Sequence, residues 1–280
     1  MNVISNDDPT ETEADSGGLS RRRVLQLAGL GAAGLAVGSL ATAAPASAHG
    51  PLARHDEIWN AITHYDVTGQ PSSFDYNPAF YGRLETFLAY WYANTPVIWR
   101  QPLRVWTYGA HYDGRVSEAH NYGRGFDLTR IVAMINGAPT KVFDGHYDEW
   151  RSLTGAELAT TRRRYWATSA CAHYHFRNVL TYPYNTDHWN HIHIDNLVSG
   201  TGNSHFDTGS EAQVKHVQAC CTYIWGYATA IDGVWGTQSD ANSRRVLSRI
   251  GRTGGLTSSQ PNWLEFNRTS VRFGSGRQDF

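Results

Sequence analysis

The chain has 280 residues, of which 41% are hydrophobic and 12% aromatic. This content is enough for a sizeable core in one or two domains, and it excludes both a disordered chain and a membrane-spanning bundle. The 24 Lys and Arg residues nearly balance the 25 Asp and Glu residues, so the charge gives no reason to expect a nucleic-acid partner.

The first 48 residues have the pattern of an export signal. Residues 20–25 (SRRRVL) match the S-R-R-x-φ-L core of a twin-arginine signal, and residues 46–48 (ASA) form an A-x-A cleavage site. We therefore predict a twin-arginine signal peptide over residues 1–48 and a secreted, extracellular or cell-wall protein without stable membrane insertion after cleavage. The alternative is an uncleaved anchor. Removal of this segment leaves 21 basic and 20 acidic residues, a formal net charge of +1.

Residues 49–200 have the pattern of a mixed domain. Aromatic and β-branched segments, such as residues 97–99 (VIW) and 103–108 (LRVWTY), alternate with polar turns that contain glycine. Helical patterns occur at about 80–93 and 155–178. This mixture predicts the α+β class.

Residues 117–127 (SEAHNYGRGFD) contain two candidate metal ligands, His120 and Asp127. The two glycines between them allow a tight bend that brings the imidazole and the carboxylate to one point. Phe126 and Leu128 flank the aspartate, so we expect them to pack in the core while the carboxylate faces a cleft.

Residues 188–195 (HWNHIHID) place three of the 13 histidines within six residues. Polar and branched apolar residues alternate here, which predicts a strand with Ile192 and Ile194 on the core side and the histidines and aspartate on the other. Imidazole suits metal ligation and proton transfer near neutral pH. An H-x-H strand alone is more often an ordinary polar face. Together with His120 and Asp127, it predicts a three-ligand zinc site with an open position for water, the pattern of catalytic zinc.

Residues 199–210 (SGTGNSHFDTGS) are turn-forming residues without periodicity, and we predict a linker over 201–210. Apolar residues then follow helical spacing over 214–224, and a second helical run lies near 239–250. This pattern predicts a separate, compact helical domain over 211–280.

The chain has three cysteines, Cys171, Cys220 and Cys221. Disulfides persist in exported proteins, but an odd number leaves at least one thiol without an intramolecular partner. The neighbours Cys220 and Cys221 are poorly placed to bridge each other. A link from Cys171 to one of them and buried free thiols are both open alternatives.

Residues 120–127 (HNYGRGFD) and 191–193 (HIH) resemble the H-x-x-G-x-A-x-D and H-x-H motifs of zinc peptidases related to D-alanyl-D-alanine carboxypeptidases, lysostaphin and penicillin-insensitive murein endopeptidase. The closest pattern is that of the extensin-like C-terminal domain of bacteria. Its run from a cysteine through F-x-x-V-L-x-P to H-x-x-H-x-H-x-D is similar to residues 171–195, and Trp150 lies where that family carries a tryptophan. The resemblance covers roughly residues 95–197.

This resemblance implies a zinc ion held by His120, Asp127 and His193, with His191 as the catalytic histidine. His188 matches an additional active-site histidine of the murein endopeptidase pattern. The family also implies a small antiparallel sheet with flanking helices, as in the hedgehog and D-Ala-D-Ala peptidase-like folds.

The sequence departs from the family pattern at two functional positions. Some relatives carry a glutamate three residues before the last zinc histidine; here it is Asn190, so we assign proton transfer to His191 and His188. The family's Y-x-C-R segment, whose arginine faces the substrate carbonyl, reads YGAH at residues 108–111. We expect His111, the last residue of this segment, or Arg115 to supply the replacement cation, and these two residues together with Ser117 to contact substrate.

Residues 214–218 (VKHVQ) and 231–236 (IDGVWG) resemble the V-x-x-L-Q and D-G-x-x-G signature of peptidoglycan-binding domains, which are small three-helix modules. The alternative is a helical extension that packs on the catalytic domain.

The two resemblances together imply a secreted zinc metallopeptidase, a carboxypeptidase or an endopeptidase, that hydrolyses peptide bonds of peptidoglycan. A non-catalytic peptidoglycan-binding cell-wall protein with a structural zinc site is the alternative from another class.

Overall fold

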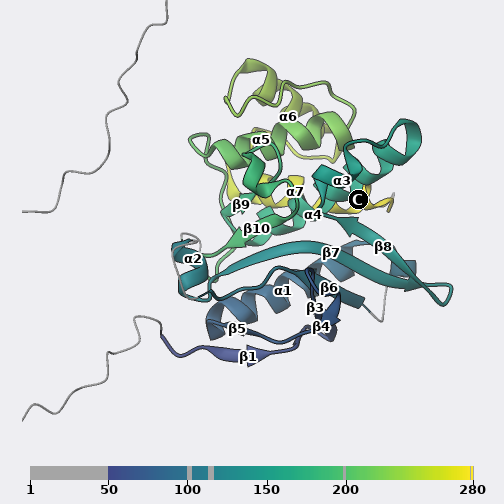
Figure 1. The fold of residues 1–280 in the computed structure, drawn as a ribbon. Helices are drawn as coiled ribbons and strands as arrows, with labels where there is room; N and C mark the ends of the chain where they lie inside the picture. The colour runs from purple at the N-terminus through teal and green to yellow at the C-terminus, as the bar shows by residue number, and fades with distance from the viewer. Residues whose placement is uncertain (1–49, 100–102, 113–116, 198–199, 278, 280) are drawn as a thin grey trace, which may run out of the picture. The chain divides into compact units, whose positions relative to one another are not determined.

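The computed structural model describes residues 50–99, 103–112, 117–197, 200–277 and 279 (Figure 1). They belong to one compact unit, Ser47–Phe280. The predicted export signal lies outside the described residues. Within the described part of the chain, no helix is both long and apolar enough to cross a membrane.

The protein belongs to the α+β class, with seven α-helices in the described residues and a mixed eight-stranded sheet. The strands are β1 (Ala53–His55), β2 (Glu57–Ile58), β3 (Ala61–Tyr65), β4 (Gln70–Pro71), β5 (Phe74–Tyr76), β6 (Leu103–Thr107), β7 (Gly125–Ile135), β8 (Ala138–Asp144), β9 (Asn178–Leu180) and β10 (Ile192–Asp195). The α-helices are α1 (Pro78–Asn94), α2 (Glu118–Asn121), α3 (Tyr147–Trp150), α4 (Gly155–His175), α5 (Glu211–Ala219), α6 (Thr237–Arg249) and α7 (Gln260–Ser275). Short helical turns are η1 (Val97–Trp99), η2 (Thr186–His188) and η3 (Cys220–Ile224).

The main sheet has the order β2-β3-β6-β7-β10-β9, with β4 beside β3 and β8 beside β7. Strands β1 and β5 form a separate pair. The prediction of an antiparallel sheet is wrong for one pairing, because β3 and β6 run parallel. A parallel neighbour needs a crossover connection, and the chain between β3 and β6 contains α1.

Helices α1 and α4 form where helical spacing predicts them, at about 80–93 and 155–178. Asn77 caps α1 by accepting hydrogen bonds from Ala79 and Phe80 backbone nitrogens, at 3.1 and 3.2 Å. The two helices contact each other, and α4 also contacts β8 and β9. Of the two aromatic segments, 103–108 contains β6, whereas residues 97–99 form the 3-10 turn η1.

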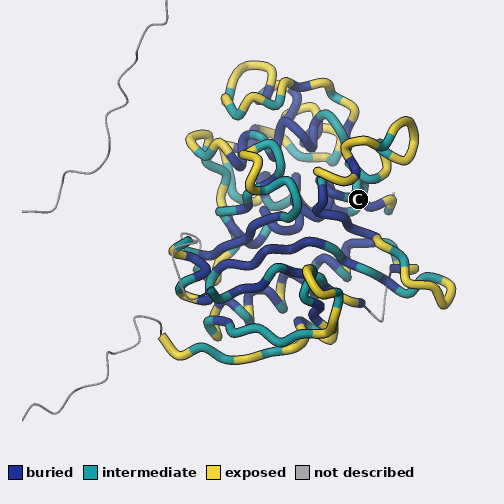
Figure 2. The backbone as a smooth tube through the Cα atoms, viewed as in Figure 1, coloured by how far each residue is buried: buried dark blue, intermediate teal, exposed yellow. Residues whose placement is uncertain are grey.

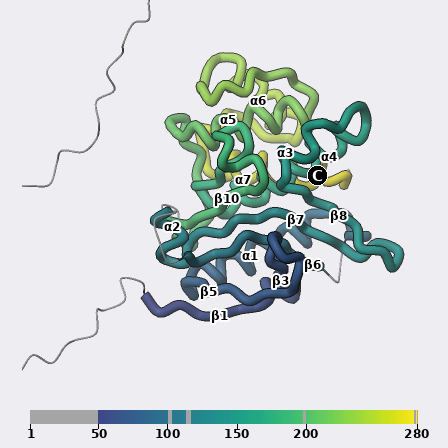
Figure 3. The backbone as a smooth tube through the Cα atoms, in the orientation of Figure 1, coloured from purple at the N-terminus to yellow at the C-terminus, as the bar shows by residue number. Residues whose placement is uncertain are grey.

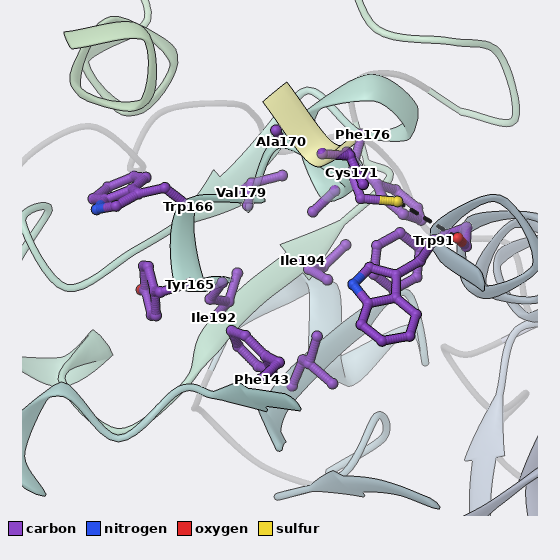
Figure 4. Close-up of a cluster of buried hydrophobic side chains, with 14 of the residues drawn as sticks. Trp91, Phe143, Tyr165, Trp166, Ala170, Cys171, Phe176, Val179, Ile192 and Ile194 are labelled. Atoms are coloured by element: carbon purple, nitrogen blue, oxygen red, sulfur yellow. Dashed lines mark hydrogen bonds between the residues drawn. The ribbon is translucent and has the colours of Figure 1, made fainter. Parts of the chain in front are cut away.

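The core lies between these helices and one face of the sheet. Ile192 and Ile194 are completely buried and lie beside aromatic side chains of the helices, including Tyr165 on α4 and Trp91 on α1 (Figure 4). The inward orientation predicted for the two isoleucines is therefore confirmed. The central strands are buried along most of their length (Figure 2), so the opposite side of β10 is fixed in place by this packing.

Helix α7 packs along α4 (Figure 3). The helices approach closely at Gly274, where a Cβ would lie 2.9 Å from the Cβ of Ala167. Trp263 on α7 is fully buried, and its indole nitrogen donates a hydrogen bond of 2.7 Å to Ser204 Oγ. Residues 201–210 and 260–275 thus contact the rest of the compact unit, and the proposed boundary between a catalytic and a C-terminal domain stays a prediction.

All three cysteines lie in the described residues, and all three are buried free thiols. Burial raises the pKa of Cys171 and of Cys220 well above the usual thiol value. Of the two alternatives from the sequence, the structure has the free thiols.

Candidate metal centre

Strands β7 and β10 place Asp127 and His193 side by side. The two residues are direct partners in the antiparallel register, and opposed residues on neighbouring strands project to the same face of a sheet. Ile192 and Ile194 project to the opposite face, into the core. Asp127 is 8% exposed and His193 is 7% exposed. Both side chains are therefore buried, and they lie on the face of the sheet opposite the one that packs against α1 and α4.

His120 reaches the same point from α2. Ser117 caps this short helix, its Oγ accepting a hydrogen bond of 3.2 Å from the backbone nitrogen of His120. The chain then turns through Gly123, whose φ is +62°, and enters β7. At Gly125, a Cβ would lie 3.1 Å from three atoms of the His120 ring. Glycine is therefore what lets the ring rest against the strand that carries Asp127, which is the bend that the glycine spacing predicts.

The three side chains converge on one another. His120 Nε2 lies 3.2 Å from both Asp127 Oδ1 and His193 Nδ1, and His193 Nδ1 lies 2.9 Å from Asp127 Oδ1. These three residues form one group whose ligand atoms lie close enough to hold a metal ion. We call them the ligand cluster.

The donor set fits zinc. Two imidazole nitrogens and one carboxylate oxygen are a three-ligand set typical of catalytic zinc sites. Ligands bound at about 2.0–2.2 Å in a tetrahedron lie roughly 3.3–3.6 Å apart, and the cluster atoms at 2.9–3.2 Å need to separate only slightly. The structure thus supports a metal site at these residues, and zinc as its metal is part of the proposal below.

The electrostatics of the cluster favour a cation. Burial acts to raise the pKa of Asp127, but hydrogen bonds with His120 and His193 outweigh it and lower that pKa well below the usual range. Burial acts to lower the pKa of His193, but Asp127 and Asp195 raise it to about 9. The two carboxylates therefore favour positive charge at His193. A metal cation that displaces the proton supplies this positive charge in its place.

A second layer of hydrogen bonds orients both histidines. His120 Nδ1 lies 2.8 Å from the carbonyl oxygen of Ala110, and His193 Nε2 lies 3.3 Å from Asp195 Oδ2. When each of these nitrogens donates its proton, His120 Nε2 and His193 Nδ1 present lone pairs to the cluster. Asp195 is held by Asn178 Nδ2 at 3.1 Å and the backbone nitrogen of Leu197 at 3.0 Å. Asp195 lies on the face that the alternation of residues 191–195 predicts, although no sequence pattern predicted a role for it.

We expect Asp195→Ala to weaken zinc binding by about 10- to 100-fold, because His193 loses the acceptor that orients its ring. Asp195→Asn is the matched control, since its side-chain oxygen can still accept a hydrogen bond from His193 Nε2–H, and its zinc affinity should fall less. Competition for zinc against chelators of graded strength measures both. Equal affinities of the Ala variant and the parent protein would contradict this role.

Two further histidines border the cluster. His191 Nε2 lies 3.4 Å from Asp127 Oδ1, and His191 Nδ1 lies 2.8 Å from Asn190 Oδ1. The ring of His188 lies 5.2 Å from that of His191, and His188 Nδ1 contacts Asn185 Oδ1. Burial lowers the pKa of His188 to about 4, with a further contribution from the neighbouring histidines, and burial also lowers the pKa of His191. Both imidazoles are therefore neutral near pH 7.

Two of the residues predicted to contact substrate, His111 and Ser117, lie in the described part of the chain. His111 directly follows Ala110, whose carbonyl contacts His120, and is partly buried. Ser117 Oγ is engaged in the cap of α2. Arg115 lies outside the described residues. Their role as substrate ligands stays a prediction.

Asp144, His146 and Glu149 form a second group of potential ligands, which the sequence analysis missed. Lys141 forms an ion pair with Asp144, and Arg130 contacts Glu149 at 3.5 Å. Since cations of the chain already neutralise these carboxylates, the group is better described as a hydrogen-bonded network than as a metal site.

His146 is the centre of this network. Its Nδ1 lies 3.3 Å from Asp144 Oδ1, and its Nε2 lies 3.1 Å from Asp66 Oδ2. Asp66 also accepts a hydrogen bond of 2.9 Å from Thr129 Oγ1. Burial acts to lower the pKa of His146, but its two carboxylate partners raise it to about 9. No local sequence signal could have found this network, because Asp66 and His146 are 80 residues apart.

Comparisons of the chain with protein-family models, with curated proteins and with solved structures found no match. A function is therefore inferred from the residues and geometry of this chain.

Proposed function

We propose that this chain is a secreted zinc metallopeptidase that hydrolyses peptide bonds of bacterial peptidoglycan, as a carboxypeptidase or an endopeptidase. One observation carries the proposal: the buried cluster of His120, Asp127 and His193 has a non-ligating imidazole, His191, at its edge. A purely structural zinc site is closed by protein ligands and has no use for a neighbouring proton carrier. The choice of peptidoglycan follows the resemblance of the two motifs to cell-wall zinc peptidases.

Bound zinc would supply Lewis-acid chemistry, polarising the scissile carbonyl and making a neighbouring water more acidic. Asn190 Oδ1 accepts a hydrogen bond from His191 Nδ1–H, so that His191 Nε2 carries a lone pair on the side of Asp127. His191 Nε2 can then accept the proton of the attacking water and return it to the leaving amine. His188, at the entrance to β10, is placed to orient substrate or share the proton.

Contacts in the C-terminal region support the second motif resemblance. Gln218 Nε2 donates a hydrogen bond of 2.8 Å to Asp232 Oδ1, and the Gly233 nitrogen donates one of 3.0 Å to Gln218 Oε1. The glutamine of V-x-x-L-Q thus holds the D-G turn of the other motif half. We propose that residues 211–280 act as a peptidoglycan-binding three-helix module, and that the sheet with α1 and α4 represents the D-Ala-D-Ala peptidase-like fold.

Digestion of purified peptidoglycan tests the enzymatic proposal. The zinc-loaded protein should release peptide fragments or D-alanine, identified by mass. A chelator should reduce release at least about a hundredfold, because zinc supplies several kcal/mol of transition-state stabilisation, and added zinc should restore it. If the metal-free protein still releases peptide fragments or D-alanine, the metallopeptidase assignment is wrong. A zinc-loaded protein that sediments with peptidoglycan but releases nothing would support the non-catalytic wall-binding alternative instead.

A further inference from the structure

Tyr108 lies at the end of β6, next to the ligand cluster, and no sequence pattern predicted a function for it. Thr107 pairs with Leu128, and continuing this register by one residue places Tyr108 opposite Asp127. The backbone agrees, since the Tyr108 nitrogen donates to the Asp127 oxygen at 3.2 Å. Tyr108, Asp127 and His193 therefore form a row across three strands, with their side chains on the same face. The ring of Tyr108 lies 5.9 Å from that of His191, in an edge-to-face arrangement.

An open pocket of about 500 Å³ adjoins this row, and Tyr108 and Tyr112 form part of its wall. The ring of Tyr112 lies 5.0 Å from that of His120, and its hydroxyl donates to the Tyr108 carbonyl oxygen. One tyrosine of the wall thus contacts a ligand of the cluster and the other contacts His191.

The hydroxyl of Tyr108 is held by buried charges. It lies 3.4 Å from His146 Nε2, and His146 is in turn held between Asp144 and Asp66. Burial raises the pKa of Tyr108 to about 12, so the phenol remains a proton donor over the neutral range. The single Nε2 proton of charged His146 is directed at Asp66 Oδ2, 3.1 Å away, and the phenol oxygen shares it at 3.4 Å. The phenol proton is left for Asp66 or for a substrate atom at the ligand cluster.

We propose that Tyr108 is a further catalytic residue, whose hydroxyl donates a hydrogen bond to the scissile carbonyl oxygen of a peptide bound at the ligand cluster. The assignment rests on the proposed function. It supplies the donor that is lacking where the related peptidases carry an arginine, since residues 108–111 read YGAH. A preorganised donor aimed at the developing oxyanion lowers the barrier more than it strengthens ground-state binding. His146 and Asp66 are positioning residues in this scheme, because they fix the phenol and do not reach the substrate.

The test compares Tyr108→Phe with Tyr65→Phe, a matched control that lines the same pocket but contacts Phe74. On soluble muropeptides, Tyr108→Phe should lower kcat by about 100- to 1000-fold with little change in KM, the range for losing an oxyanion donor. Zinc content should be unchanged in both variants, and Tyr65→Phe should keep near-normal kcat. A Tyr108→Phe protein with normal kcat, or one that no longer holds zinc, would overturn the catalytic assignment.

A second readout does not depend on peptidoglycan. Acetohydroxamic acid presents a zinc-binding carbonyl, and its affinity for the zinc-loaded protein can be measured by calorimetry. Tyr108→Phe should weaken this binding by about threefold to tenfold, the effect of one hydrogen bond. If the parent protein does not cut peptidoglycan but Tyr108→Phe still weakens hydroxamate binding, the peptidoglycan assignment fails and the role of Tyr108 stands. If the parent protein cuts peptidoglycan and Tyr108→Phe changes neither kcat nor hydroxamate affinity, the peptidoglycan assignment stands and the role of Tyr108 fails.

The positioning role of His146 has its own signature. His146→Ala should lower kcat without raising KM, and the double variant with Tyr108→Phe should be no worse than Tyr108→Phe alone, because both changes remove the same donor. Additive losses would show that His146 acts elsewhere.

Discussion

Replacing His193 by alanine should remove zinc and peptidase activity together, whereas replacing His191 should leave most of the zinc and lower turnover by about 100- to 10,000-fold. His193 Nδ1 lies within the ligand cluster, 2.9 Å from Asp127 Oδ1 and 3.2 Å from His120 Nε2. His191 Nε2 lies 3.4 Å from Asp127 Oδ1 but is not part of that group. A three-ligand site tolerates the loss of a proton carrier but not of a ligand.

The measurement is zinc content against muropeptide cleavage for each purified variant. Asp127→Ala is the control for ligand loss and should match His193→Ala in both readouts. His188→Ala should keep its zinc and show a smaller loss of turnover than His191→Ala, because His188 lies farther from the cluster along the chain. A zinc-free His191→Ala protein beside a zinc-loaded His193→Ala protein would reverse the two roles.

Trp263→Ala should lower the free energy of unfolding by about 3–5 kcal/mol, the usual cost of deleting a large buried aromatic side chain. Trp263 is fully buried, lies 5.2 Å from the ring of Phe206 and 5.9 Å from the ring of His173 on α4, and donates to Ser204 Oγ. The resulting cavity would lie where α7, α4 and residues 201–210 meet. Packing across this junction would therefore be lost.

Urea unfolding, followed by tryptophan fluorescence and by far-ultraviolet circular dichroism, measures this effect. Val234→Ala is the surface control, since Val234 is 66% exposed and exposed substitutions change stability by about 0.5 kcal/mol or less. If residues 211–280 unfold as part of the whole, both probes should report one transition that Trp263→Ala shifts. Two separable transitions, only one of which moves, would instead support an independent C-terminal domain.

Local periodicity was sufficient for the parts of the fold that depend on short-range spacing. Alternation at Ile192 and Ile194 predicts a strand with its apolar side inward, and β10 has that orientation because a slip of one residue would turn both isoleucines out of the core. Helical spacing likewise predicts α1 and α4. The parallel pairing of β3 with β6 could not be predicted in this way, because the two strands are about 40 residues apart and local spacing carries no information on which strands pair.

The sequence by itself determined which donors the site has. His120, Asp127 and the two histidines of the H-x-H strand carry the required chemistry, and the glycines at 123 and 125 permit the bend that the cluster needs. Only the tertiary structure decided what surrounds them. Asp195, two residues from His193 on β10, is held in contact with it by its register partner Asn178 on β9. The network from Asp66 through His146 to Tyr108 joins segments that are far apart in the chain. Such partners are selected by burial, because a charged or polar group enclosed in the protein must find its hydrogen bonds wherever the fold brings a partner.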